Sequence, residues 1–393
     1  MVAAHEESEI NAASGRPRPA LPLPLALSLK LRLWRNRQIA RPGFRRLIAR
    51  LPLLRGIANR NAAGLFSLMS GFVHSQILLA SVRLGLYAAL LERPADTATL
   101  ARHLGLPVEH ARLLLTVNAD LGLTIEAAPD LWALGDAGVV LASDRGLSAM
   151  VLHHDMFYRD LLEPEQLLAG TGGEAALGRY WAYARSADPG ALPPEAVAAY
   201  STLMRESQAM MAACLLDAHD FGVYRQVLDV GGGEGAFLIA AGRRHAALRL
   251  SLFDLPAVAE RGAERLQAGG LASRSSTSGG DFARDLLPAD ADCVTLIRIL
   301  CDHDDQRVGA ILANLHRSLQ PGTRLVIAEA MRGAEAGARL SSAYFGLYFL
   351  AMGSGRCRSP AEISALLATA GFRDIREIAS PNRLIAGIFT AIR

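Results

Sequence analysis

The clearest pattern of apolar and polar positions lies between residues 227 and 256. An apolar run from Val227 to Val230 ends in a glycine-rich turn, GGGEG, at 231–235. Apolar positions at helical spacing follow, and a second apolar run then ends at Asp254. This order predicts a strand, a turn, a helix and a strand, which form one half of an α/β nucleotide-binding sheet.

The turn and the acid that follows it indicate the kind of ligand. Gly231 and Gly233 permit a tight turn and a close approach of the backbone to a ligand. Asp254, about 20 residues further on, suits the two hydroxyls of a ribose. Glu234 stands where it would repel a pyrophosphate. A ligand with a ribose and no phosphate, such as S-adenosylmethionine, is therefore favoured over a dinucleotide, and a purely structural turn is the third alternative.

Further motifs extend this pattern toward the C-terminus. The chain contains LDVGGGEG, FDLP, GDF, LCDHDDQ and LQPGTRLVIAE in this order, and the last two follow a fourth apolar run at 291–300. Over residues 70–393 it resembles the two-domain, adenosylmethionine-dependent small-molecule O-methyltransferases. The resemblance implies an α/β fold, a Rossmann-like class I methyltransferase sheet with an N-terminal winged-helix dimerisation domain. It also implies S-adenosylmethionine as cofactor, with Gly231 and Gly233 at its amino-acid moiety, Asp254 at its ribose, and Asp281 and Phe282 beside its adenine.

Four segments are expected along the chain. They are a basic amphipathic arm at 1–64, a winged-helix-like dimerisation domain at 65–143, a helical linker and acceptor-pocket region at 144–226, and the adenosylmethionine-binding methyltransferase domain at 227–393. Within the second segment the pattern predicts a helix, a turn at Gly105 and Pro107, a helix and a small hairpin. Winged helices often bind DNA. The few basic residues here argue against DNA binding, so no nucleic-acid partner is expected, and the resemblance implies a homodimer contact instead.

The arm is basic although the chain as a whole carries a net charge of only +3. No acid occurs between Glu9 and Glu92, and Lys and Arg alternate with apolar residues over 30–60. This composition favours peripheral contact with an anionic membrane surface, and packing on a partner subunit is the alternative. No apolar run is expected to reach the ~18–20 residues of a membrane span. The charges follow the apolar patch at 20–29, which argues against a signal peptide and for a cytoplasmic enzyme.

Four cysteines occur without metal-ligand spacing, at Cys214, Cys293, Cys301 and Cys357. The sequence therefore predicts no metal site and no disulfide, as in a reducing cytosol.

An apolar acceptor pocket is expected from 144–226 and from the helix near 340–356, because SSAYFGLYFLAMGSG is apolar on nearly every face. Half of the Met and aromatic residues in these segments are expected to be plain core. For His153 and His154 a core or surface position is favoured over contact with an acceptor. The candidates are Met150, Met156, Phe157, Tyr158, Tyr180, Trp181, Tyr183, Met204, Met210, Met211, Tyr344, Phe345, Tyr348, Phe349 and Met352.

The resembled family carries its general-base histidine in an L-H-D-W motif, and that position is Cys301 here. Asp302 matches, His303 replaces the tryptophan, and Glu329 matches the supporting acid, whereas a second family acid falls on Cys357. The resemblance thus gives Asp302, His303 and Glu329 as catalytic candidates. Because positioning can supply much of the rate of methyl transfer, a weak proton acceptor such as His303 or Glu329 is predicted to suffice. A capping or surface role for His303 stays open.

Where the chain departs from the general family motif, it resembles the carotenoid branch of the family. These departures include RNRQIARPGFRRLIARLPLLRGIANR at 35–60, the LCDHDD run and GRCRSP. That branch methylates the tertiary hydroxyl of acyclic carotenoids of the demethylspheroidene type, so the predicted acceptor is a hydroxycarotenoid. A tetrapyrrole, a polyketide or a phenol is the alternative acceptor. A non-catalytic, adenosylmethionine-sensing winged-helix regulator is the alternative of another class.

Overall fold

The structure, a computed structural model, describes residues 22–181 and 208–393. Two expected pocket residues, Tyr183 and Met204, and the first 21 residues of the arm lie outside the described residues. The chain divides into two units, residues 1–76 and 77–393, and each is described by itself.

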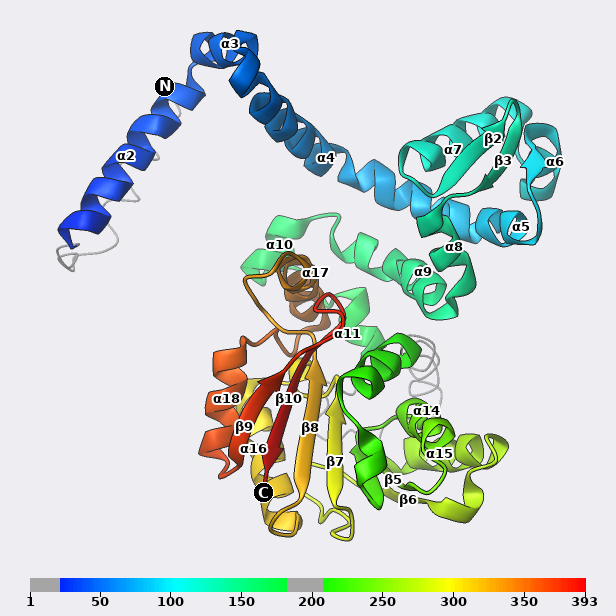
Figure 1. Cartoon of the computed structure of the whole chain (residues 1–393), viewed down its shortest axis with the longest axis vertical. Coiled ribbons are helices and arrows are strands. Elements are labelled where there is room, and N and C mark those ends of the chain that lie inside the picture. The colour runs from blue at the N-terminus through cyan, green and yellow to red at the C-terminus, as the bar shows by residue number, and fades with distance from the viewer. Residues whose placement is uncertain (1–21, 182–207) are drawn as a thin grey trace. The chain divides into compact units, whose positions relative to one another are not determined.

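The described residues of the first unit form helices. They are α2 (Leu23–Ala40), α3 (Pro42–Arg50) and most of α4 (Pro52–Arg83) (Figure 1). In α2 leucines occupy every second position, and a helix with 3.6 residues per turn spreads such a pattern over all its faces. In α3, by contrast, Phe44, Leu47 and Ile48 lie opposite the arginines. The arm is therefore amphipathic in α3 and apolar on all sides in the first turns of α2.

The expectation that no segment is long and apolar enough to cross a membrane is wrong. Leu54–Arg83 is a 30-residue stretch of helix. Its most apolar window has a mean hydropathy of 1.5, and 11% of that window is buried. The reason is that residues 61–82 carry no Lys, Arg, Asp or Glu. Length and composition of this kind also suit a helix that packs against protein. A row of its large apolar side chains is more than 60% exposed: Leu65, Phe66, Leu68, Met69 and Phe72.

Three helices and a small sheet follow in the second unit. They are α5 (Leu86–Glu92), β1 (Ala95–Asp96), α6 (Thr97–Leu104), α7 (Val108–Asp120), β2 (Thr124–Ala128) and β3 (Leu131–Leu134), with strand order β1-β3-β2. Asp96 caps α6 at its start, and Gly105, in the left-handed region, ends it. The helix–turn–helix–hairpin order agrees with the sequence pattern. The expected boundary at residue 64 falls inside α4, and the winged-helix and dimerisation assignments stay predictions.

Up to residue 181 the described chain continues with four further helices: α8 (Asp136–Ser143), α9 (Arg145–Asp160), α10 (Pro164–Ala169) and α11 (Ala176–Tyr180). Asp144 caps α9 through hydrogen bonds from the backbone N–H groups of Gly146 and Leu147. Helices α9 and α11 pack against each other and against α17 (Ala336–Met352), which follows the fifth strand of the large sheet. Segments nearly two hundred residues apart are thus brought side by side.

The large sheet has seven strands in the order β6-β5-β4-β7-β8-β10-β9 (Figure 1). The first five are parallel, and β10 is antiparallel to both of its neighbours. Every residue of β4 and β7 is buried, as expected for a parallel sheet with helices on both faces. The strands are β4 (Gln226–Val230), β5 (Arg249–Asp254), β6 (Ser275–Gly279), β7 (Cys293–Ile297), β8 (Arg324–Glu329), β9 (Arg373–Ile378) and β10 (Gly387–Ile392).

Helices α14 (Ala236–Arg244), α15 (Pro256–Ala268), α16 (Asp305–Ser318) and α18 (Pro360–Thr369) connect these strands. The fourth apolar run of the sequence forms β7, and the final strand, β10, is reversed. Ser359 caps α18 in a reciprocal capping box with Glu362. The order of the sheet reverses between β4 and β7, which is the place where open α/β sheets bind ligands.

Candidate active site

The glycine turn after β4 has no room for side chains at its first position. Gly231 has a φ of 71°, and a Cβ built there would lie 2.4 Å from Cδ1 of Ile299. Gly233 also has a positive φ, 60°, but no atom lies within 4 Å of its Cβ position. The turn is therefore packed on one side and open on the other, which leaves space for a ligand along the backbone.

Asp254 lies at the end of β5 with its carboxylate against this turn. It accepts hydrogen bonds of 2.7 Å from the backbone N–H groups of Gly233 and Leu255. Burial raises its pKa to about 6, although the two hydrogen bonds act in the opposite direction. Glu234 is paired with Arg261 at 3.3 Å. A carboxylate held this way keeps lone pairs for a further donor, and its contact with a ribose stays a prediction.

Asp281 and Phe282 follow β6 at the same edge of the sheet. Asp281 accepts hydrogen bonds from the backbone of Ala283 at 2.9 Å and from Arg307 at 3.1 Å. The Phe282 ring reaches within 3.4 Å of the Cβ position of Gly231. The structure thus brings all five expected cofactor contacts together at the carboxyl ends of β4, β5 and β6.

The segment after β7 forms a tight turn, η4 (Leu300–Asp302), whose backbone N–H groups are bound by Glu329. One Glu329 oxygen accepts from the backbone of Ile299 at 2.9 Å and of Leu300 at 2.7 Å, and the other accepts from Cys301 at 3.3 Å. Only 1% of Glu329 is exposed, and burial raises its pKa to about 7. Its carboxylate is therefore occupied by the backbone of the turn.

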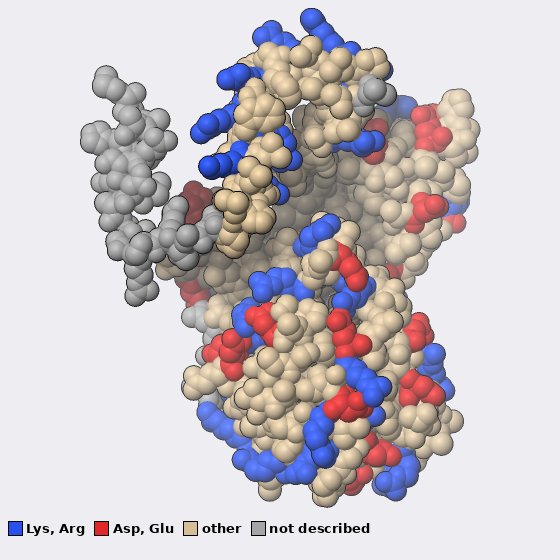
Figure 2. Space-filling model, turned by 60° about the vertical axis from the view of Figure 1, so that its left-hand side comes forward, with Lys and Arg blue, Asp and Glu red and all other residues tan. Residues whose placement is uncertain are grey.

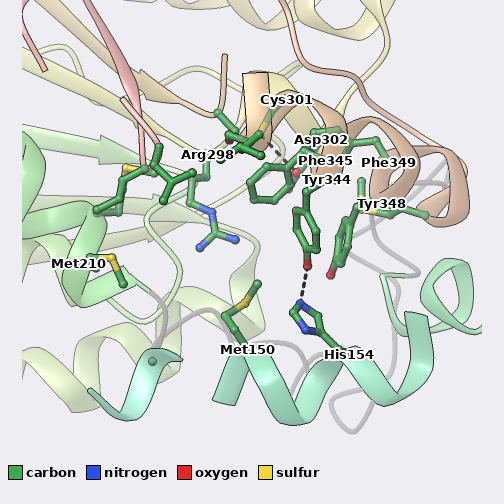
Figure 3. A pocket seen from close by; sticks show the side chains of 18 of the residues that line it. Met150, His154, Met210, Arg298, Cys301, Asp302, Tyr344, Phe345, Tyr348 and Phe349 are labelled. Carbon is green, nitrogen blue, oxygen red and sulfur yellow. Dashed lines mark hydrogen bonds between the residues drawn. The ribbon is translucent and has the colours of Figure 1, made fainter. Parts of the chain in front are cut away.

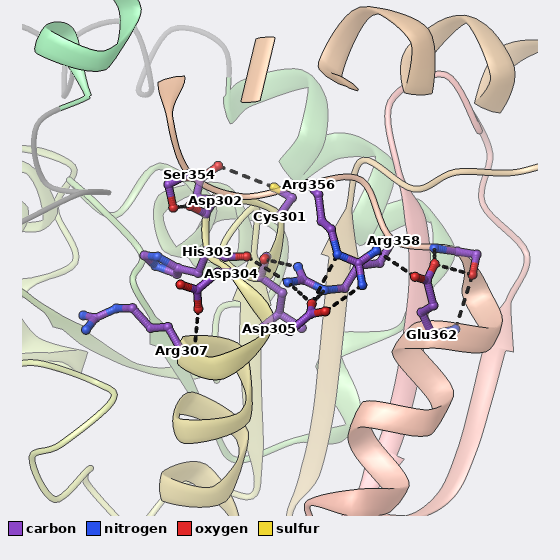
Figure 4. Close-up of polar contacts among 12 residues, drawn as sticks. Cys301, Asp302, His303, Asp304, Asp305, Arg307, Ser354, Arg356, Arg358 and Glu362 are labelled. Carbon is purple, nitrogen blue, oxygen red and sulfur yellow. Dashed lines mark hydrogen bonds and ion pairs between the residues drawn. The ribbon is translucent and has the colours of Figure 1, made fainter. Parts of the chain in front are cut away.

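The backbone carbonyl groups of the same turn accept hydrogen bonds from residues 354–358. The buried guanidinium of Arg358 donates to the carbonyl oxygens of Leu300 at 2.5 Å and His303 at 2.8 Å, and it also binds Asp305 (Figure 4). The backbone N–H of Arg356 donates to the Cys301 carbonyl at 2.9 Å. The hydroxyl of Ser354 donates to the Asp302 carbonyl at 2.8 Å. We call residues 354–358 with Glu329 the clamp of the 299–303 turn.

A cavity of about 490 Å³ opens on the other side of this turn (Figure 3). Most of its lining is aliphatic or aromatic, and α17 contributes seven of the lining residues. The described residues that line it are Gly146, Leu147, Met150, His154, Trp181, Met210, Met211, Arg298, Cys301, Asp302, Ala330, Leu340, Ser341, Tyr344, Phe345, Tyr348, Phe349, Met352, Leu384 and Ile385.

The catalytic candidates do not meet at one surface. Asp302 lines the cavity, as does Cys301, whereas His303 and Glu329 do not. His303 is 3% exposed, its ring lies 5.9 Å from that of Phe282, and its Nδ1 atom has no hydrogen-bond partner in the structure. Burial lowers the pKa of His303 to about 4, so its imidazole is neutral at neutral pH. That His303 or Glu329 accepts a proton stays a prediction.

Several pocket expectations are confirmed by the lining, and others belong to the core. Met150, Trp181, Met210, Met211 and the five candidates of α17 line the cavity, whereas Met156, Phe157, Tyr158 and Tyr180 do not. Sequence reasoning missed Arg298, which has a φ of 58° and lies on the cavity wall. It also missed Arg358, whose only sequence signal is its place in the GRCRSP motif. In the described ranges, 22–181 and 208–393, no His, Cys, Asp or Glu cluster suits a metal ion.

Asp254→Asn is expected to weaken S-adenosylmethionine binding by about two orders of magnitude. An amide in this position loses a charged acceptor, which is worth about 2–3 kcal/mol. Asp292→Asn is a matched control, because Asp292 also accepts two backbone hydrogen bonds, from Arg225 and Gln226 at the other end of the sheet. Titration calorimetry should show unchanged affinity for Asp292→Asn. If the wild-type enzyme and both variants bound S-adenosylmethionine with equal affinity, the cofactor site would lie elsewhere.

Arg358→Lys is expected to lower kcat by up to about 10²-fold, because an ammonium cannot hold both carbonyls of the turn and small displacements near the reacting groups are costly. Arg356→Lys is the control. Its side chain, 40% exposed, binds Asp305 and Glu362, and its contact to the turn is made by the backbone. Steady-state kinetics should show near-normal kcat for Arg356→Lys, and equal losses in both variants would contradict the clamp.

Comparison with known proteins places this geometry in a family. An O-methyltransferase domain model matches residues 182–373. The demethylspheroidene O-methyltransferase of Cereibacter sphaeroides is 41% identical over 350 residues, covering 89% of this chain and 92% of that protein. The corresponding enzyme of Rhodobacter capsulatus is 37% identical, covering 88% of this chain and 86% of its own length.

Solved structures agree with the sequence relatives. A methyltransferase of calicheamicin biosynthesis, solved with S-adenosylhomocysteine bound, has a TM-score of 0.67 and 26% identity over 85% of this chain and 97% of that one. A mitomycin 7-O-methyltransferase has a TM-score of 0.67 and 25% identity over 86% of this chain and all of that one. The class I methyltransferase fold, the cofactor and the enzyme class are thereby established, and the regulator alternative is set aside. The chain belongs to the S-adenosylmethionine-dependent O-methyltransferase family.

Proposed function

We propose that this enzyme methylates the tertiary hydroxyl of an acyclic hydroxycarotenoid of the demethylspheroidene type. The observation that carries the proposal is the cavity beside the 299–303 turn, where Phe345, Phe349 and Met352 give a lining that suits a long hydrocarbon acceptor. The names of the two relatives that align over most of this chain agree with it.

Positioning carries most of the catalysis in this proposal. S-adenosylmethionine, when bound, supplies a methyl group on a sulfonium. Ile299 packs against Gly231 on the cofactor side of the turn, while Cys301 and Asp302 face the acceptor cavity on the other side. The turn therefore touches both sites and can set how the acceptor oxygen faces the methyl group, which is what an in-line transfer needs.

Cys301 does not replace the family histidine as a base. Burial, with the nearby carboxylates of Glu329 and Asp302, holds the pKa of its thiol well above the usual range. Of the three catalytic candidates, we propose that Asp302 contacts the acceptor. Glu329 acts as a positioning residue through the backbone of the turn, and His303 supports Phe282 on the cofactor side.

The acceptor assignment is tested by transfer of labelled methyl to a panel of hydroxycarotenoids, simple phenols, tetrapyrroles and polyketides. The expected result is that kcat/KM for an acyclic hydroxycarotenoid exceeds that for any phenol by on the order of 10²-fold, since the apolar wall binds the hydrocarbon in the transition state. Faster methylation of a phenol, a tetrapyrrole or a polyketide would overturn the proposal and identify the alternative acceptor.

We further propose that the enzyme is a cytoplasmic homodimer that contacts an anionic membrane surface through its arm. Basic side chains stand among apolar ones along α2 and α3 (Figure 2). An apolar acceptor dissolves in a membrane, and this contact brings the enzyme to it. The exposed apolar row of α4 at Leu65–Phe72 is proposed as part of the surface that meets a second copy of the chain.

Removal of residues 1–51 is expected to release the enzyme from anionic liposomes and to leave a dimer. Each basic residue near such a surface contributes roughly 1 kcal/mol, and salt weakens the attraction. Sedimentation with liposomes measures the first effect, and light scattering measures the mass. Salt-independent sedimentation, or sedimentation unchanged by the deletion, would refute the membrane contact, and a monomeric full-length chain would refute the dimer.

A further inference from the structure

Two adjacent histidines of α9 meet two tyrosines of α17 in two parallel hydrogen bonds. Nε2 of His153 lies 2.6 Å from the hydroxyl of Tyr348, and Nε2 of His154 lies 2.8 Å from the hydroxyl of Tyr344. The two tyrosines are one helical turn apart, as the two contacts require. The pairs differ in their surroundings, and this difference carries the inference.

The His153–Tyr348 pair is a closed structural contact. Only 6% of His153 and 5% of Tyr348 are exposed, and Nε1 of Trp181 also donates to the Tyr348 hydroxyl, at 2.7 Å. Because Trp181 can only donate, the Tyr348 oxygen accepts from it, and the same hydroxyl makes its second hydrogen bond with Nε2 of His153. Both of these partners belong to the wall, and His153 does not line the cavity, although Tyr348 does.

The His154–Tyr344 pair is open to the cavity. Both residues line it and both are half-buried (Figure 3). Within the described residues, His154 is the one hydrogen-bond partner of the Tyr344 hydroxyl. A phenolic oxygen has two lone pairs, so Tyr344 can donate to His154 and still accept a hydrogen from a bound acceptor.

The protonation states suit this direction of transfer. Burial lowers the pKa of His154, so its imidazole is neutral at neutral pH and Nε2 can accept. Burial raises the pKa of Tyr344 above its usual value, so its hydroxyl is protonated and can donate. The adjacent Asp155 does not line the cavity and is already paired with Arg83 at 2.8 Å and with Arg159.

We propose that Tyr344 and His154 form the proton relay that replaces the family's missing histidine base. The proposal rests on the proposed function, since it concerns the fate of the acceptor's hydroxyl proton. The acceptor oxygen forms a bond to the methyl carbon, and the S–CH₃ bond breaks with its electron pair going to sulfur. The resulting oxonium passes its proton to the Tyr344 oxygen, Tyr344 passes its own proton to Nε2 of His154, and an imidazolium remains.

The groups offered by the sequence motif are less suitable. Cys301 is a neutral thiol, and His303 and Glu329 do not reach the cavity. Asp302 does line it, and it accepts a weak hydrogen bond from the Cys301 thiol at 3.6 Å. Asp302 is therefore the competitor that the experiment has to separate from the relay.

The test measures kcat, acceptor KM and S-adenosylmethionine affinity for His154→Ala, Tyr344→Phe, the double variant and Asp302→Asn. His154→Ala and Tyr344→Phe should each lower kcat by about 10²-fold, the lower end of what a general base contributes. The double variant should be no slower than the slower single variant, because both residues act in one relay. Affinity for S-adenosylmethionine should stay normal, which also shows that the variants are folded.

Rescue of activity by added imidazole distinguishes a proton acceptor from a residue with a purely structural role. Imidazole should restore part of the activity of His154→Ala and none of Tyr344→Phe. His153→Ala is the matched control, which should lose thermal stability and gain nothing from imidazole. A near-normal kcat in His154→Ala would overturn the relay. So would a loss of kcat in His153→Ala equal to that in His154→Ala, with no rescue by imidazole, or a large loss of kcat in Asp302→Asn alone. A wild-type enzyme that methylates no hydroxycarotenoid would instead overturn the proposed function.

Discussion

The turn at residues 299–303 depends on hydrogen bonds from both sides of its backbone. Glu329 accepts from the N–H groups of Ile299, Leu300 and Cys301, while Arg358 and residues 354–356 occupy the carbonyl groups from Leu300 to His303. A turn whose polar backbone is satisfied in this way has little freedom to move. Ile299 packs toward the glycine turn and Asp302 lines the cavity, and we propose that these few residues fix how the two reactants meet.

The clamp also links the turn to the acceptor wall. Residues 354–358 continue directly from α17, whose side chains form much of the cavity, and α17 is tied to α9 by the two His–Tyr hydrogen bonds. The position of the acceptor and the position of the turn are thus set by one continuous piece of chain. In our proposal, alignment in an apolar cavity lowers the demand on the base, so that the weak proton acceptor His154 suffices without a histidine in place of Cys301.

Much of the fold follows from local pattern, whereas the site depends on contacts that no pattern encodes. The glycine turn, Asp254 and the apolar strands predict the sheet because their signals lie within a few residues of one another. The role of Arg358 escapes prediction because burying its guanidinium requires carbonyl groups from a distant segment and the carboxylate of Asp305. His153 and His154 look alike in sequence, and only the packing of α9 on α17 places one in the core and the other on the cavity wall.

The central claim is that the 299–303 turn is preformed, and amide hydrogen exchange measures this directly. In the enzyme without ligands, the N–H groups of Ile299, Leu300 and Cys301 should exchange as slowly as those of the neighbouring strand β7, because Glu329 holds all three. Addition of S-adenosylmethionine or acceptor should change these rates little. Rapid exchange in the free enzyme, with protection appearing only when both ligands bind, would contradict the account.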